Sequence, residues 1–257
     1  MEDLTITRAL VIPSYGEDLA LPDLLETLAG SLSKEDVIIV ADDSKPDIRT
    51  RLVAGCHTAT KNSPGLIRFT FAESKSGRGS AVRRGMELAR REYPNLEYVL
   101  ECDADGSHQA RDIVRVRDSS INCDLLVGSR YLKDSQIIGW PIARRIFSKL
   151  LNALIPRVLD LPMKDVTNGL RRYSIEAVDL VLSKDANSKG FIYLSEQALL
   201  ISRSGLRIAE IPIIFIDREL GTSTVTWREI SSSIFGIFRL ILLNSGSNLK
   251  RNVKRNL

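Results

Sequence analysis

Histidine and cysteine are scarce in this sequence. Of its 257 residues, only His57 and His108 are histidines, and only Cys56, Cys102 and Cys123 are cysteines. With so few histidines we expect neither a His-based zinc site nor a histidine-dependent catalytic triad. The cysteines have no metal-type spacing, their number is odd, and residues 1–9 carry no secretory signal, so we expect a reducing, cytoplasmic setting.

Long apolar runs are also lacking. The longest, residues 234–243, is interrupted by Gly236 and Arg239, and as a helix it would reach about 15 Å, half of a roughly 30 Å hydrocarbon core. We therefore expect no transmembrane span. Four basic residues and no acid stand among the last eight positions. This pattern indicates an interfacial anchor on anionic lipid or a partner-binding helix; an ordinary C-terminal core helix is the alternative.

The length and composition favour one large folded domain. A hydrophobic content of 44% and a charged content of 26% are ordinary for a globular protein, and the net charge of +4 is too modest to indicate a nucleic-acid binder. No internal repeat or linker rich in Pro, Gly or Ser interrupts the chain. We expect one domain over residues 1–226, followed by an apolar helix and basic tail over residues 227–257.

Apolar runs of strand length alternate with helical patterns through the first half. Continuous apolar strands separated by helices predict an α/β fold with a mostly parallel central sheet and helices on both faces. The expected strands are residues 9–12, 37–40, 66–71, 98–102 and 125–127, with helices over residues 21–32 and 80–91. In the second half we expect helices over residues 142–155 and 192–202, the first with a broad apolar face, and a strand over residues 208–216. Pro212 favours an edge position for that strand, and Arg117 is expected on a solvent-facing helix.

Acidic pairs follow two of these strands. Asp103 and Asp105 follow the expected strand at 98–102, and Asp42 and Asp43 follow the strand at 37–40. Ligands of open α/β sheets bind beyond the carboxyl ends of the strands. Two carboxylates at such an edge can hold Mg²⁺ or Mn²⁺, which usually also binds substrate phosphates. Aspartates at strand ends are also common turn residues, so a structural role is the alternative.

Four short motifs follow one another along the first half of the chain: VIPSYGE at residues 11–17, ADDS at 41–44, DAD at 103–105 and GSRY at 128–131. Their order resembles that of family-two inverting glycosyltransferases of the GT-A fold. Further motifs are similar to those of dolichol-phosphate mannose synthases and related polyprenyl-phosphate glycosyltransferases: GWP at 139–141 leading to Arg144 and Ser148, DVTNG at 165–169, and DRELGTS at 217–223. The resemblance covers residues 9–224.

The resemblance implies transfer of a sugar, most often mannose from GDP-mannose, to a polyprenyl or dolichyl phosphate. A divalent ion would stabilise the departing diphosphate as a Lewis acid, and guanidinium groups would add fixed positive charge. The implied metal ligands are Asp103, Asp105 and Ser107, and the implied phosphate- and acceptor-binding residues are Arg130, Arg144, Ser148 and Arg218. Of these, Asp103, Asp105, Arg130 and Arg218 would be catalytic. A solvated surface position is the alternative for each arginine, and Arg145 competes with Arg144.

The resemblance also implies a nucleotide-sugar site. Its residues would be Pro13, Tyr15, Glu17, Asp42, Asp43, Gly77, Asp103, Ala104 and Asp105. Helix capping or a turn accounts equally well for Asp42 and Asp43. The Gly77-Arg78-Gly79 segment is similar to a phosphate-cradling loop, although a tight turn into the following helix explains it equally.

No dedicated general base stands near these motifs, which fits an acceptor that is already ionised. A phosphate can attack the anomeric carbon directly, whereas a sugar hydroxyl needs a base. Because a polyprenyl chain stays in lipid, we expect a peripheral protein on the cytoplasmic face of a membrane. Enzymes of this kind carry their own transmembrane helices, use small membrane partner subunits, or have neither.

Three departures from the family pattern leave alternatives open. Ser107 stands where a larger ligand is usual, Leu170 where an aromatic is usual, and Thr224 where lysine often follows Gly-x-Ser. The sequence therefore leaves open a related enzyme that uses UDP-glucose or another acceptor, and an inactive nucleotide-binding homologue. A sugar-phosphate nucleotidyltransferase is a further alternative, but residues 14–17 lack its glycine-rich signature with lysine.

Overall fold

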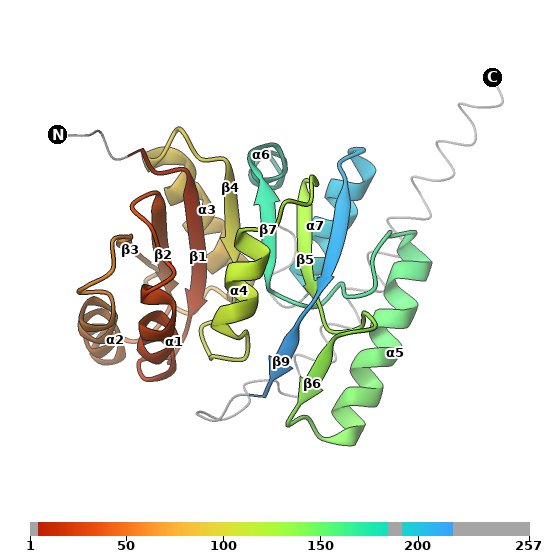
Figure 1. Cartoon of the computed structure of the whole chain (residues 1–257), viewed down its shortest axis with the longest axis horizontal. Coiled ribbons are helices and arrows are strands. Elements are labelled where there is room, and N and C mark those ends of the chain that lie inside the picture. The colour runs from red at the N-terminus through yellow and green to blue at the C-terminus, as the bar shows by residue number, and fades with distance from the viewer. Residues whose placement is uncertain (1–4, 185–191, 218–257) are drawn as a thin grey trace.

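The structure is a computed structural model that describes residues 5–184 and 192–217 (Figure 1). A seven-stranded sheet forms its centre, and a two-stranded sheet lies beside one end. The strands of the central sheet, in spatial order, are β3 (Leu66–Phe71), β2 (Asp36–Asp42), β1 (Arg8–Ser14), β4 (Tyr98–Glu101), β7 (Arg171–Ser174), β5 (Leu125–Ser129) and β8 (Ile208–Pro212). All pair in parallel except β7, which is antiparallel to both neighbours. The expected α/β fold with a mostly parallel sheet is confirmed.

The central strands form because they are apolar on both faces. All seven residues of β2 are buried. In β1, Ala9 and Val11 point into one hydrophobic core, and Leu10 and Ile12 point into a second core. Such two-sided burial is typical of parallel strands covered by helices on both faces.

Helices cover both sides of the sheet, as predicted (Figure 1). One core contains side chains of α1 (Ala20–Ala29), α2 (Pro46–Ala59) and α4 (Ala110–Arg117), and the other contains side chains of α3 (Arg78–Glu92), α6 (Ile175–Leu182) and α7 (Ile192–Arg203). The remaining helix, α5 (Ile142–Leu159), contributes Ile155 and Leu159 to the core that contains side chains of α3, α6 and α7. No helix in the described part of the chain is both long and apolar enough to cross a bilayer.

The predicted strand over residues 208–216 is two strands. After β8, the chain crosses to pair β9 (Ile214–Ile216) in parallel with β6 (Gln136–Ile138). The break falls at Ile213, whose N–H donates to the Ser129 carbonyl oxygen at 3.1 Å. Pro212 lies at the end of β8, which is an edge strand of the central sheet. The edge prediction is therefore confirmed. Because Ile213 still donates to β5, the N–H that Pro212 lacks would point away from β5 at this edge, where a proline is tolerated.

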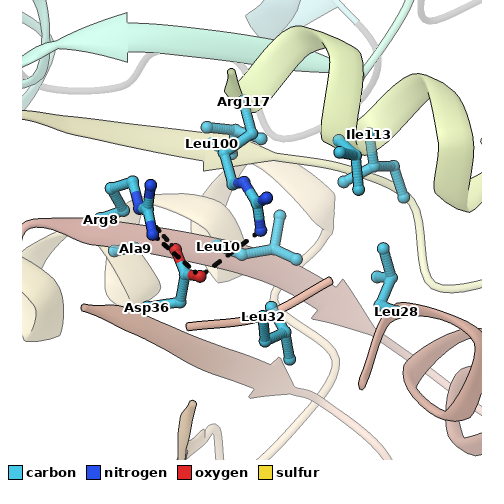
Figure 2. A pocket seen from close by; sticks show the side chains of 10 residues that line it. Arg8, Ala9, Leu10, Leu28, Leu32, Asp36, Leu100, Ile113 and Arg117 are labelled. Carbon is cyan, nitrogen blue, oxygen red and sulfur yellow. Dashed lines mark hydrogen bonds and ion pairs between the residues drawn. The ribbon is translucent and has the colours of Figure 1, made fainter. Parts of the chain in front are cut away.

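The expectation for Arg117 is wrong. Its side chain is only 14% exposed and lies 3.4 Å from Asp36 Oδ2, which Arg8 also contacts. Figure 2 shows the three charged groups around a small apolar pocket lined by Leu28, Leu32, Leu100 and Ile113. The charged residue at the last turn of α4 therefore ties that helix to the start of β2. This pocket lies at the amino ends of β1 and β2, so the expected ligand edge is the opposite one.

Candidate active site

The carboxyl ends of β1, β2 and β4 bring the predicted acidic residues to one edge of the sheet. Ser14 at the end of β1 is in register with Asp42 at the end of β2, and the Asp103–Asp105 turn follows the end of β4. These ends meet because the three strands run parallel and β1 lies between the other two. The structure therefore places both acidic pairs where α/β sheets bind ligands.

A buried histidine holds the backbone of the Asp103–Asp105 turn, the predicted metal-binding motif that is called the metal motif below. The Asp103 N–H donates to His108 Nδ1 at 3.1 Å, and His108 Nε2 lies 2.8 Å from Asn168 Oδ1. In this arrangement Nδ1 is the acceptor and Nε2 is the donor. The amide of Asn168 in turn donates to the Gly128 carbonyl oxygen on β5. His108 thus links the Asp103 turn to the 165–169 segment, a role that the sequence analysis did not assign.

Arg78 is a second residue that the sequence analysis missed. Its Nε and Nη2 donate to Asp103 Oδ1 at 2.9 and 2.6 Å, and its Nη1 contacts Glu101 and the Tyr193 hydroxyl. The Arg78 side chain is 16% exposed, Glu101 is fully buried, and the Asp103 side chain is 27% exposed. The Arg78 guanidinium ion therefore offsets the negative charge of Asp103 and of the buried Glu101.

The charge of Arg78 changes the acidity of Asp103. Burial alone would raise the pKa of this carboxyl, but its interactions with Arg78, then with His108 and Arg130, lower the pKa to about 2. Asp103 is therefore ionised throughout the neutral range. The only sequence signal for Arg78 was its place between two glycines at the start of a helix. Gly77 has a φ of +92°, a backbone conformation that would be strained for a residue with a side chain.

The second aspartate of the motif is held by its own turn. Asp105 Oδ1 accepts the Ser107 N–H at 3.1 Å and the Ser107 hydroxyl at 2.6 Å. Gly106 between them has a φ of +74°, which favours glycine. Ser107 is buried and orients Asp105; its role as a metal ligand stays a prediction. An open groove runs from this turn to α1, lined also by Asp23, Leu24 and Thr27.

The predicted nucleotide-binding residues surround the loop before α3. Asp43 accepts hydrogen bonds from the Ser76 N–H and hydroxyl, both at 2.7 Å, and from the Gly77 N–H at 3.2 Å. It also pairs with Arg84 at 2.8 Å. Asp42 is fully buried and accepts the Ser44 N–H and hydroxyl. Both aspartates therefore stabilise turns in this structure.

Other predicted residues of the nucleotide site lie on the loop after β1. Tyr15 is 41% exposed, and Lys75 Nζ lies 4.2 Å from its ring centroid. Pro13 is half-buried in β1, and the Glu17 carbonyl oxygen accepts the Leu21 N–H at 3.1 Å in the first turn of α1. The loops after β1 and β3 thus approach each other next to the acidic edge. Ala104 of the metal motif is buried between its two aspartates.

The Arg130 side chain is fixed by a buried ion pair, which its predicted role did not include. Its Nε and Nη2 donate to the two oxygens of Asp165, each at 2.8 Å, and Nη2 also donates to Thr167 at 2.7 Å. Both partners of the ion pair are buried, and the guanidinium carbon lies 5.2 Å from the Trp140 ring and 5.3 Å from the Phe215 ring. The structure places Arg130 near the acidic edge, where its charge helps to lower the pKa of Asp103. Its contact with a diphosphate stays a prediction.

The predicted acceptor residues Arg144 and Ser148 lie on α5. Arg144 Nη1 pairs with Asp217 Oδ1 at 3.0 Å, and its guanidinium carbon lies 4.1 Å from the Trp140 ring centroid. Ser148 Oγ accepts the Tyr131 hydroxyl at 2.6 Å. Arg218, predicted as catalytic and phosphate-binding, lies outside the described residues, as do Thr224 and the predicted C-terminal helix and tail.

The chain matches a known family over most of the described part. The sequence profile described as "Glycosyl transferase family 2" matches residues 9–181. An undecaprenyl-phosphate mannosyltransferase from Micrococcus luteus is 31% identical over 89% of this chain and 91% of its own length. A polyprenol monophosphomannose synthase from Mycolicibacterium smegmatis is 29% identical over 89% of this chain and 84% of its own length.

Solved structures share the fold at lower identity. A glucosyl-3-phosphoglycerate synthase from Mycobacterium tuberculosis in complex with UDP has a TM-score of 0.61 and 17% identity, covering 94% of this chain and 80% of that one. A mannosyltransferase from Pyrobaculum calidifontis in complex with GDP-Man and Mn²⁺ has a TM-score of 0.58 and 13% identity, covering 95% and 70%.

Proposed function

We propose that this chain, which belongs to glycosyl transferase family 2 and is a glycosyltransferase, transfers mannose from GDP-mannose to a polyprenyl phosphate. One observation carries the proposal. An Asp-x-Asp turn follows a central strand at the ligand edge of the sheet, in a chain that is 31% identical to an undecaprenyl-phosphate mannosyltransferase over nearly its whole length. The two curated relatives support the lipid phosphate as acceptor, and the GDP-mannose donor is the finer part of the proposal.

The donor set of the acidic turn fits a hard divalent ion. In the described part of the chain no cluster of three or more His, Cys, Asp or Glu side chains forms a closed metal cage. Mg²⁺ and similar ions do not need one, because one or two carboxylates together with substrate phosphates suffice. Asp103 and Asp105 would hold Mg²⁺ or Mn²⁺, and Mn²⁺ is present in the Pyrobaculum calidifontis complex. The ion would supply Lewis-acid stabilisation of the diphosphate.

The reaction would be a single displacement with inversion. An oxygen of the acceptor phosphate forms a bond to the anomeric carbon while the bond from that carbon to the donor diphosphate breaks, and its electron pair leaves with the diphosphate. No proton has to move, since the attacking phosphate is already ionised. The chain's task is therefore to orient both phosphates and exclude water.

Each group of predicted residues has a place in this scheme. Tyr15, Pro13 and Glu17 at the loop after β1 would contact the base and ribose, with Asp42 and Asp43 supporting that loop and the one before α3. Arg144 and Ser148, together with Arg218, would bind the phosphates. Arg130 would add positive charge near the diphosphate from its buried position against Asp165.

The acceptor also implies where the protein works. A polyprenyl phosphate remains in a bilayer, so we propose that the chain binds peripherally to the cytoplasmic face of a membrane, with or without a small membrane partner subunit. This part of the proposal depends on the acceptor and falls with it.

Donor choice and turnover can be tested in one sequence of experiments. Thermal melts with GDP, GDP-mannose, UDP and UDP-glucose, each with and without Mn²⁺, should show a metal-dependent rise in melting temperature for the guanosine ligands. A ligand at a hundredfold excess over Kd adds about 2.7 kcal/mol of stability. Mass spectrometry of the lipid product should then show one added hexose on a polyprenyl phosphate. A rise only with UDP-glucose would favour the related enzyme, and binding without turnover on any lipid phosphate would favour an inactive homologue.

A further inference from the structure

The outward face of α5 is apolar, and the described residues leave it exposed. Ten large hydrophobic side chains in the described part of the chain are exposed, and five of them lie on α5. They are Ile142 (78% exposed), Ile146 (55%), Phe147 (41%), Leu150 (63%) and Leu154 (54%). Figure 1 shows α5 at the outer edge of the molecule, beside β6.

The spacing of these residues makes one continuous surface. Four of them recur at every fourth position, and at 3.6 residues per turn all five fall within an arc of roughly 140°. The opposite side of the helix buries Asn152, Ile155 and Leu159. The helix is therefore apolar both toward the core and away from it, which is typical of a surface that binds a partner.

The charge of α5 indicates what the partner is. The helix contains Arg144, Arg145, Lys149 and Arg157 and no acidic residue. Arg145 and Lys149 are exposed, and their positions border the apolar arc on one side. An apolar stripe with basic residues at its edge is the pattern of helices that lie in the interface of an anionic bilayer.

The same helix carries two of the predicted acceptor residues. Arg144 and Ser148 face inward, where they contact Asp217 and Tyr131. A surface that holds α5 against a bilayer would therefore bring these two residues close to lipid headgroups.

We propose that the apolar face of α5, formed by Ile142, Ile146, Phe147, Leu150 and Leu154, binds the surface of an anionic membrane. This inference rests on the proposed function, because a lipid-bound acceptor is what requires the site to approach a bilayer. It moves the expected membrane contact from residues 234–243, which lie outside the described residues, to a helix next to the site.

The test uses the full-length chain and vesicles of phosphatidylcholine with and without phosphatidylglycerol. We compare the wild type, the double variant Ile146→Glu/Leu150→Glu, and Ile121→Glu as the matched control. Ile121 is 38% exposed and precedes β5, at the end of that strand away from the acidic edge. The double variant should lower partitioning onto anionic vesicles by more than about tenfold, since two apolar side chains leave the lipid. The control should bind as the wild type does.

A second variant separates the electrostatic contribution. Lys149→Gln should lower binding to anionic vesicles by about fivefold and leave binding to neutral vesicles unchanged. It also keeps the test decisive if the double variant does not fold. Melting temperatures of all variants should stay near that of the wild type, because the altered side chains are exposed.

Four outcomes would overturn the proposal. A wild type that ignores anionic vesicles, or a double variant that still binds them, excludes a lipid contact here. A double variant with a lower melting temperature and unchanged vesicle binding would mean that residues 218–257 cover the face. A changed oligomeric state would mean that a second copy does.

Transfer assays distinguish this failure from that of the proposed function. With a short, water-soluble polyprenyl phosphate, the double variant should retain wild-type transfer, whereas transfer to a long-chain acceptor in vesicles should fall at least tenfold. If the wild type transfers to both acceptors without binding vesicles, the surface is wrong and the function stands. If it binds vesicles through α5 but transfers to neither, the function is wrong.

Discussion

The Arg78–Asp103 pair and the Arg130–Asp165 pair both join an arginine to an aspartate near the acidic edge, but they differ in what they leave unsatisfied. Asp165 is fully buried and accepts the Arg130 backbone N–H at 2.9 Å in addition to the two side-chain bonds. It also accepts the Asn168 N–H at 3.1 Å. In the Arg78 pair, both bonds to Asp103 end on Oδ1, and the aspartate is 27% exposed.

This difference separates the Arg130–Asp165 pair, here called the closed pair, from the Arg78–Asp103 pair, here called the open pair. The closed pair is structural, whereas the open pair can take part in chemistry. Asp165 has its hydrogen-bonding capacity used by its own loop and by Arg130, so it fixes the fold around the site. Asp103 has Oδ1 committed and its Oδ2 3.8 Å from His108 Nε2, a ring that donates to Asn168 instead. The exposed carboxylate is therefore the one that can accept a cation. The following predictions test whether stability and activity divide between the two pairs in this way.

The largest expected effect is on stability, at the closed pair. Asp165→Ala leaves the buried Arg130 guanidinium without its counter-ion, which should lower the free energy of unfolding by about 3–5 kcal/mol. Urea denaturation measures this. The control is Asp179→Ala, because Asp179 is 53% exposed and pairs with Arg90 on the surface; that change should cost under about 1 kcal/mol. Equal losses at the two positions would remove the structural assignment of the closed pair.

The next effect is on activity, at the open side of the site. Asp105→Ala should reduce transfer by about 10²–10³-fold if, as proposed, this carboxylate helps to hold the ion that stabilises the departing diphosphate. The free energy of unfolding should change little, since the Asp105 carboxylate accepts the Ser107 N–H and hydroxyl within a local turn. Steady-state transfer assays with Mg²⁺ or Mn²⁺ give the rate. Near-normal turnover would rule out Asp105 as a metal ligand.

The architecture was predictable because the apolar pattern determines it. A run such as residues 37–40 can be buried only by helices on both faces of the sheet, and β2 is buried throughout. The strand β7 was not predicted, because its sequence Arg171-Arg172-Tyr173-Ser174 carries neither an apolar run nor alternation. Its buried Arg171 donates to three backbone carbonyl oxygens, a partner set that only the folded chain assembles.

The site was predictable where a motif places its residues and not where long side chains converge. The acidic edge follows from strand ends, whereas Arg78 reaches Asp103 across 25 positions and His108 reaches Asn168 across 60. The apolar face of α5 is a second feature that the sequence predicted only in part. Periodicity correctly predicted an apolar helix, but only the structure shows that half of that apolar surface faces outward.

A smaller effect is expected where Gly169 approaches the open pair. A Cβ at this position would lie 2.1 Å from Arg78 Nη2 and 3.0 Å from Asp103 Oδ1, so Gly169→Ala should displace Arg78 from Asp103. Arg78 cannot move freely, since its other nitrogen contacts Glu101 and Tyr193. We expect transfer to fall by about 10–100-fold through loss of a preorganised charge.

Gly30→Ala is the matched control for that change. A Cβ at Gly30 meets nothing within 4 Å, and its φ of −70° suits any residue. This variant should keep wild-type transfer. If Gly169→Ala also transfers normally, then Arg78 does not need to contact Asp103 for the reaction.

The smallest effect is the pH dependence of the open pair. Burial raises the pKa of Asp103, but the interactions with Arg78, together with those of His108 and Arg130, more than offset this and lower the pKa from 3.8 to about 2. A carboxyl whose pKa is lower in the folded state stabilises the fold above its ordinary pKa and loses that contribution as the pH falls from about 4 toward 2. The full contribution is about 2 kcal/mol, and roughly half of it should be lost at pH 3. Urea denaturation with a chelator present, at about pH 6 and about pH 3, gives the difference in stability between the wild type and Asp103→Asn. That difference should shrink by about 1 kcal/mol at the lower pH, because the asparagine cannot titrate while all other carboxyls are shared. A difference that stays constant between the two pH values would mean that Arg78 does not hold Asp103 ionised, and the open pair would then be no more than a contact between neighbours.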